Sequence, residues 1–265
     1  MGLEKMQKEG RVSKTSTLRG LKKEYEIATS QLLEVLKFML QTPKRIEDYR
    51  IEKEAHLEIL ELLEPDSQIK DHLSNEIKSL KGQSKIVYSM SLVYGIAHIE
   101  SYLNNLTRLL LRYYWKNLKT KGRTLTYEEV LNFKSLDSLK ENLIEKEVML
   151  FSHMGIDEKI SFFEKKLHVE FSYERVQGIR HNWNCIELQG LKNIFLKRNL
   201  ILHNGSHVNH EYVKSTGYSD YEPGDKIAID REYALQSLSL LMRISGSFLS
   251  VFKNKIENKK STKSS

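Results

Sequence analysis

The spacing of apolar and polar positions predicts an all-α protein built around two strong helices. From about 83 to 118, apolar residues recur every three or four positions, which places them in a stripe about 80° wide on a helix. The stripe consists of Tyr88, Leu92, Ile96, Ile99, Leu103, Leu106 and Leu110. A second apolar helix is expected at 185–203, followed by Asn204-Gly205 as a left-handed cap. Its apolar band consists of Leu188, Leu191, Ile194, Phe195, Ile201 and Leu202. We expect the two helices to pack together in a bundle.

Weaker patterns predict the remaining elements. Shorter helices are expected at 18–40, 44–63, 66–80, 126–133, 136–149 and 156–167. The segments Tyr212–Thr216 and Lys226–Ile229 alternate in polarity, which predicts a small β-hairpin around Pro223-Gly224. A last helix should begin after Asp230, an N-cap residue, and continue to about 254.

The same patterns suggest a division into domains. We expect a disordered tail at 1–16, an added N-terminal helical segment at 17–82, a main helical domain at 83–254 and a disordered basic tail at 255–265. The phrase Glu64-Pro65-Asp66 should break the chain between two helices.

Composition narrows the class of protein only slightly. The formal net charge of +7 favours a polyanionic partner such as nucleic acid, although lysines near both ends contribute much of it. Cys185 is the sole cysteine, which excludes an intrachain disulfide and fits a reducing compartment. We find no secretory leader and no run of about 18 apolar residues, so a cytoplasmic protein without a membrane span is expected.

One group of residues near the end of the second helix suggests chemistry. Arg198 falls near the middle of that helix's apolar band, Asn199 lies at its edge, and His203 is about 40° from Asn199. Buried polar groups of this kind need partners, water or an anionic substrate. His203 also occupies the last helical turn, where the helix dipole favours the protonated ring. Such an imidazole suits acid–base work near neutral pH.

These residue types match the requirements of RNA cleavage. RNA carries its own nucleophile, the 2′-hydroxyl, beside each phosphodiester. A base must take its proton, an acid must protonate the leaving 5′ oxygen, and a cation must stabilise the phosphorane charge. An arginine and a histidine, duplicated across a two-fold axis, could do this without a metal or another cofactor.

The motif resembles that of the HEPN superfamily, in which an arginine, a polar residue and three variable residues precede a histidine. Arg198 to His203 has this spacing, and the flanks at 187–205, 209–214 and 224–227, with the helix at 94–110, are also similar. The resemblance covers about residues 85–252 and is nearest the RiboL-PSP-HEPN type. It implies a helical bundle, dimerisation through the motif helices and metal-independent cleavage of single-stranded RNA. It further implies a toxin or antiviral defence role, with an antitoxin or defence-system protein as a possible partner.

Several alternatives remain open. The chain could be a catalytically inactive HEPN module that dimerises or binds RNA or protein, or an unrelated helix that ends in a polar cap. Arg175 and His181 have a similar spacing but lack the polar residue after the arginine, so we discount them. Weaker RNA-binding candidates are His207, His210, Arg112 and Lys116. His207 and His210 have no further ligands nearby in the sequence, so surface positions are favoured over a metal site.

Overall fold

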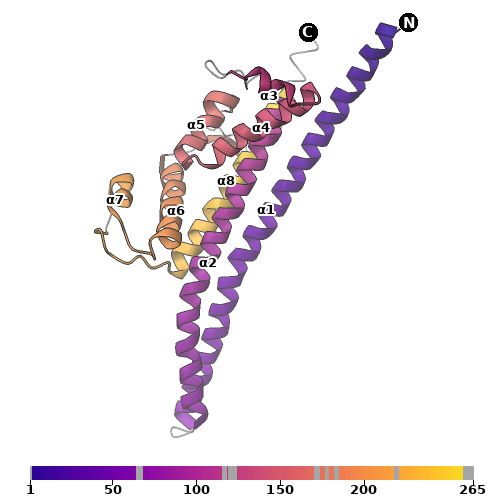
Figure 1. Ribbon diagram of the computed structural model, residues 1–265. Coiled ribbons are helices and arrows are strands. Elements are labelled where there is room, and N and C mark those ends of the chain that lie inside the picture. The colour runs from indigo at the N-terminus through magenta and orange to yellow at the C-terminus, as the bar shows by residue number, and fades with distance from the viewer. Residues whose placement is uncertain are drawn as a thin grey trace. The chain divides into compact units, whose positions relative to one another are not determined.

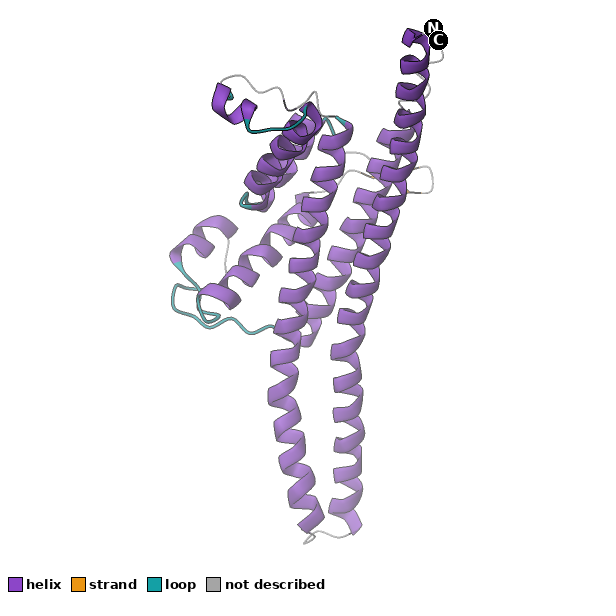
Figure 2. Cartoon of the chain, turned by 45° about the vertical axis from the view of Figure 1, so that its right-hand side comes forward, coloured by secondary structure: helices purple, strands orange, loops and turns teal. Residues whose placement is uncertain are grey.

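The described part of the chain is mostly helical in a computed structural model (Figures 1 and 2). The structure describes residues 2–63, 68–114, 118, 124–169, 174–176, 179–181, 185–217 and 221–258. Its helices are α1 (Gly2–Leu63), α2 (Gln68–Tyr113), α3 (Tyr127–Leu131), α4 (Leu136–Ser152), α5 (Ile156–Leu167), α6 (Cys185–His203), α7 (His210–Thr216) and α8 (Arg231–Asn258). The predicted all-α class is confirmed.

Helix α1 is longer than the sequence predicts. It continues through Pro43, where two helices were expected, and its backbone is helical from Gly2, where a disordered tail was expected. Proline inside a helix costs about 3 kcal/mol because it removes one hydrogen bond and crowds the preceding turn. The Thr42 hydroxyl donates to the Phe38 carbonyl at 2.9 Å, one turn before the proline. Pro43 is itself buried, so packing helps to carry the helix past it.

Helix α2 confirms the predicted apolar stripe. All seven of its members, from Tyr88 to Leu110, are buried. The helix nevertheless begins at Gln68, so the expected break near residue 82 does not occur and Gly82 lies inside it. The expected domain boundary between 82 and 83 therefore falls within one continuous helix. Asp66, in the expected break at Glu64-Pro65-Asp66, lies outside the described residues. The disordered tail expected at 255–265 differs from the structure at its start, because α8 continues to Asn258, and residues 259–265 lie outside the described residues.

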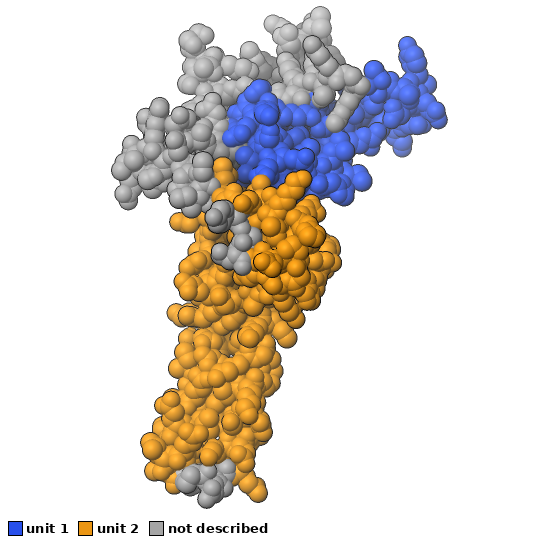
Figure 3. All heavy atoms as spheres, turned by 90° about the vertical axis from the view of Figure 1, so that its left-hand side faces the viewer, with its two compact units in different colours: residues 1–32, 99–184, 245–265 blue, residues 33–98, 185–244 orange. Residues whose placement is uncertain are grey.

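Contacts divide the chain into two compact units, each made of separate stretches (Figure 3). Unit 1 contains Met1–Leu32, Ile99–Asn184 and Ser245–Ser265, and unit 2 contains Leu33–His98 and Cys185–Ile244. This division replaces the sequential one predicted from the sequence. Three long helices, α1, α2 and α8, each contribute residues to both units.

The core of unit 1 combines an aromatic cluster with a buried polar contact. Phe151, Phe162, Phe163 and Phe248 form a set of edge-on and tilted ring pairs. Elsewhere in the unit, the hydroxyl groups of Thr29 and Tyr102 lie 3.2 Å apart, joining α1 to α2. Arg108 also donates from Nη2 to Glu145 of α4 at 2.9 Å. These contacts bring together segments that are far apart in the sequence.

In unit 2, α1 and α2 form an antiparallel hairpin. Glu54 pairs with Lys81 at 3.0 Å, and Glu47 accepts a hydrogen bond from Tyr88 at 3.3 Å. Residue numbers rise along one helix as they fall along the other, which is the signature of antiparallel packing. These contacts place the part of α1 around Glu54 beside the part of α2 that precedes Lys85.

Helix α8 packs against two other helices of unit 2. A Cβ atom added at Gly95 of α2 would lie 2.7 Å from Leu238 Cδ2, and one added at Gly190 of α6 would lie 2.9 Å from Leu240 Cδ2. Helix α8 therefore lies close to α2 at Gly95 and close to α6 at Gly190. Direct packing between the apolar faces of α2 and α6, which the sequence predicts, stays a prediction.

The hairpin predicted around Pro223-Gly224 is wrong. Residues 210–216 form helix α7, in which the Asn209 side chain caps the start by accepting from the Tyr212 amide at 2.8 Å. Tyr212 is buried and also donates to Asn193 of α6 at 3.0 Å, a contact that anchors α7. Lys226 makes only an isolated bridge with His207. The alternation was too short to outweigh the cap and this tertiary contact.

A short antiparallel ladder does occur, but at another place. Strands β1 (Glu174–Val176) and β2 (Ile179–His181) pair with Arg175 opposite Arg180 and Glu174 opposite His181. The discounted Arg175–His181 pair therefore lies on strands and does not share a helix, unlike the motif at 198–203.

Candidate functional site

The candidate motif occupies the last turns of α6, whose end is set by a left-handed cap. Gly205 has φ of +58°, and the amides of Asn204 and Ser206 both donate to the Leu200 carbonyl, at 3.0 and 2.9 Å. Asn204 also donates from its side chain to the His207 carbonyl at 2.6 Å. The helix consequently ends at His203, as the sequence predicts. The cap thereby satisfies the Leu200 carbonyl, one of the last in the helix.

The structure brings Arg198 and Asn199 into direct contact. Arg198 Nη1 donates to Asn199 Oδ1 at 3.0 Å, which directs the asparagine carbonyl toward the guanidinium and leaves its amide NH₂ to donate elsewhere. Arg198 is half-buried, whereas Asn199 and His203 are exposed. Asn199 and His203 are one turn apart on the same helix, so both can reach one solvent-borne ligand.

Burial along α6 differs from the predicted band. Leu202, expected in the core, is 49% exposed, whereas Leu200, expected outside it, is buried. The segment that follows α6 folds back and covers Leu200 with Val208, Tyr212 and Ile227. A helical wheel drawn for α6 alone cannot include this return of the chain.

Sequence reasoning missed a buried cation beside the motif. Lys197 is only 8% exposed, and its Nζ lies 3.7 Å from the centre of the Tyr233 ring and 5.8 Å from that of Tyr221. Burial lowers the pKa of Lys197, and the nearby carboxylate of Asp230 opposes this change. The ring face stabilises the ammonium by a cation–π contact. Its aromatic partners come from distant segments, so no local signal in the sequence reveals them.

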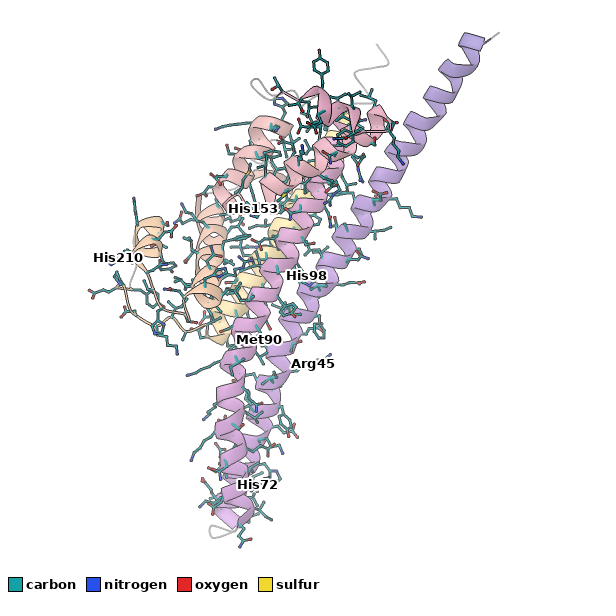
Figure 4. The ribbon with its side chains drawn as sticks, in the orientation of Figure 1. Arg45, His72, Met90, His98, His153 and His210 are labelled. Atoms are coloured by element: carbon teal, nitrogen blue, oxygen red, sulfur yellow. The ribbon has the colours of Figure 1, made fainter. Side chains whose placement is uncertain are left out.

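The weaker RNA-binding candidates fall in different places. His207 and His210 are exposed on the segment that runs from the end of α6 into α7, where Figure 4 labels His210. Arg112 belongs to unit 1 and donates from Nε to Glu141 at 2.9 Å. Lys116 lies outside the described residues. Only the two histidines are therefore near the motif in the chain and in the same unit.

The described part of the chain offers little to a metal ion. It contains no group of three or more His, Cys, Asp or Glu side chains that could hold one. None of the helices in the described ranges is both long enough and apolar enough to cross a membrane.

Comparison with known proteins adds no family assignment. No protein-family model, curated protein or solved structure matches this chain. The HEPN resemblance consequently rests on the motif and its flanks.

Proposed function

We propose that this protein is a metal-independent endoribonuclease of the HEPN type that cleaves single-stranded RNA. The observation that carries the proposal is the arrangement at the end of α6. There Arg198 is held by Asn199, and an exposed histidine follows one turn later. A cation, an amide and an imidazole thus lie on one rigid helix end, in a position accessible to a polyanion.

Each residue has a defined role in the proposed reaction. His203 accepts the 2′-hydroxyl proton or donates a proton to the leaving 5′ oxygen. Arg198 stabilises the negative charge that develops on the phosphorane, and Asn199 orients Arg198. The products carry 2′,3′-cyclic phosphate and 5′-hydroxyl ends. His207 and His210 extend the basic, polar surface along which RNA would lie.

The proposed active form is a symmetric homodimer through the motif helices. Arg198 and His203 are about 140° apart around α6, so one helix cannot direct both squarely at the same phosphate. Two helices that meet across a two-fold axis can place the arginine of one opposite the histidine of the other. In the cell, such an enzyme would act in the cytoplasm as a toxin or antiviral effector, under the control of an antitoxin or defence-system protein.

The decisive experiment measures cleavage of single-stranded RNA in the presence of EDTA. Wild-type protein should cut RNA and leave DNA of the same sequence intact, because DNA lacks the 2′-hydroxyl. His203→Ala should lower the rate by about 10²–10⁴-fold, the usual range for a positioned acid or base.

A matched histidine provides the control. His153 is also exposed at the C-terminal end of a helix, α4, but belongs to unit 1 (Figure 4). His153→Ala should leave cleavage nearly unchanged. Inert wild-type protein on a broad RNA panel, or full activity in His203→Ala, would rule out the catalytic assignment.

A non-catalytic binding module is the second candidate. The long α1–α2 hairpin favours it, because exposed apolar side chains such as Ile59 and Leu62 lie near the end of that hairpin. In that case RNA would bind without being cut, and the hairpin would contact another protein.

A further inference from the structure

A groove with an apolar floor lies in unit 2 between α2 and the segments around the end of α6. Its volume is about 580 Å³. It is lined by Lys85, Ile86, Met90, Tyr94, Leu202 and Lys226, among others. Ile86, Met90 and Tyr94 are each more than half exposed, although a soluble helix usually buries such side chains. Figure 4 labels Met90 on α2.

The charged groups that line the groove carry only one sign of charge. Lys85 and Lys226 are exposed at its rim, and among the described residues no aspartate or glutamate lines it. A groove that met an identical groove could therefore form no ion pair. The lysine-rich ends of the chain, one of which contains Lys259 and Lys260, are also positively charged. The lysines of the groove would therefore repel them.

The far part of α1 has the complementary character. Ile51, Ala55, Ile59 and Leu62 are exposed and step by four, four and three residues, so they form a stripe about 80° wide. Exposed glutamates accompany this stripe along the helix, namely Glu52, Glu58 and Glu61. The segment is thus an acidic amphipathic helix whose apolar face has no cover in the described chain.

The two surfaces also match in shape. Ile51, Ala55 and Ile59 form a ridge of residues four apart, as do Ile86, Met90 and Tyr94. Ridges of this kind interdigitate in the commonest class of helix packing. Ala55 is small and lies in the middle of its ridge, which leaves room for a large side chain such as Met90.

The acidic segment cannot reach the groove within its own chain. Glu54 is paired with Lys81, and Lys53 with Glu76, so this part of α1 lies along α2 before the groove begins at Lys85. Because both helices are continuous here, the segment is held away from the groove. The occupant must come from another molecule.

We propose that the groove binds the acidic α1 segment, residues 51–62, of a second copy of this chain. The contact places apolar ridges against each other and brings Glu58 and Glu61 of one copy to the lysines of the other. When both copies contribute a groove and a segment, the interface is made twice, which is the arrangement expected of a closed dimer. This contact is separate from the motif-helix contact proposed above, adds to it within the same dimer, and does not depend on the ribonuclease activity.

Reversal of charge on each surface tests the proposal with the full-length protein. The double variants Lys85→Glu/Lys226→Glu and Glu58→Lys/Glu61→Lys should each weaken self-association at least about tenfold in sedimentation velocity. An equimolar mixture of the two should recover association, because the reversed groove then meets the reversed segment. The control is Lys134→Glu/Lys165→Glu, which alters two exposed lysines of unit 1 and should associate as wild type.

A second variant tests the apolar part of the contact. Met90→Glu should also weaken association at least about tenfold, whereas Leu136→Glu, at an exposed leucine of unit 1, should not. Circular dichroism should show all variants folded, because every altered side chain is exposed. Wild-type protein that stays monomeric, groove variants that associate normally, or a mixture without recovery would each overturn the proposal.

Discussion

Two neighbouring cations of α6 have different surroundings. Lys197 is enclosed by Tyr233 and Tyr221, whereas Arg198 is half-buried and bound to Asn199. One residue turns a helix by about 100°, so adjacent side chains face different neighbours. The cost of burying a charge therefore falls on Lys197, and the arginine of the motif keeps access to solvent.

The stability of Lys197→Met should reveal that cost. Burial lowers the pKa of Lys197 below its ordinary 10.5, so the unfolded chain binds this proton more tightly than the folded chain. Wild-type stability should consequently rise as pH increases through the interval between the folded and unfolded pKa values. Lys197→Met lacks this dependence, so it should be more stable than wild type near neutral pH.

Urea unfolding at about pH 7 and about pH 10 would measure this difference. The advantage of the methionine variant should shrink as the pH approaches 10.5. A variant that is less stable than wild type at neutral pH would show that the contact with Tyr233 outweighs the loss of hydration.

At the scale of elements, residues that usually interrupt helices sit inside the long ones. Pro43 lies within α1, and Gly82 and Gly95 lie within α2. Gly82 is exposed, with nothing near its missing side chain, whereas Gly95 is buried against Leu238. Gly82 therefore has room for a side chain, whereas a side chain at Gly95 would require Leu238 to shift.

Alanine substitutions at these glycines should have opposite effects. Gly82→Ala should stabilise the protein by about 0.5–1 kcal/mol, because alanine favours the helix and meets no obstacle. Gly95→Ala should destabilise it by about 1–3 kcal/mol, because its Cβ would lie 2.7 Å from Leu238 Cδ2 and the core must shift.

Thermal unfolding of both variants, compared with wild type, would check the pair. Gly95→Ala should cost less stability in the Leu238→Ala background than in wild type, because the smaller side chain at 238 leaves room for the added Cβ. Equal effects at the two glycines would show that α8 does not pack closely on α2 at Gly95.

At the scale of the whole molecule, the chain order differs from the order of packing. Unit 1 consists of three separate stretches of the sequence and unit 2 of two. Cleaving the chain at a single peptide bond therefore cannot separate the units. Removal of residues 1–80 as an independent segment is therefore expected to damage both units, since α1 contributes to each. Function should be tested on the full chain.

Mixing two inactive variants tests the shared site of the proposed dimer. If the arginine of one copy works with the histidine of the other, an Arg198→Ala/His203→Ala heterodimer retains one complete site. Random exchange should then restore about a quarter of wild-type cleavage, because half of the dimers are mixed and each has one of two sites.

Cleavage assays after the variants are mixed and allowed to exchange would measure this recovery. Each variant alone should stay nearly inactive. Lack of recovery, despite demonstrated exchange of subunits, would place both residues of each site within one chain.

Local patterns in the sequence determined the helical class and several boundaries of the fold. The seven-residue stripe of α2, the span of α6 and the Asp230 cap, which accepts from the Tyr233 amide at 2.7 Å, were all predicted. These features depend on neighbours within one or two turns, where helix periodicity and capping act. The placement of Arg198 and Asn199 on one helix followed for the same reason.

Tertiary structure alone decided which side chains of α6 are buried and which segments share a unit. The return of the chain through Val208 and Tyr212 buries Leu200, and the rings of Tyr221 and Tyr233 enclose Lys197. The continuity of α1 through Pro43 and the helical form of 210–216 likewise reflect packing and long-range hydrogen bonds. Such contacts join residues far apart in the sequence, so the energy that overrides local preference is not visible in any short window of it.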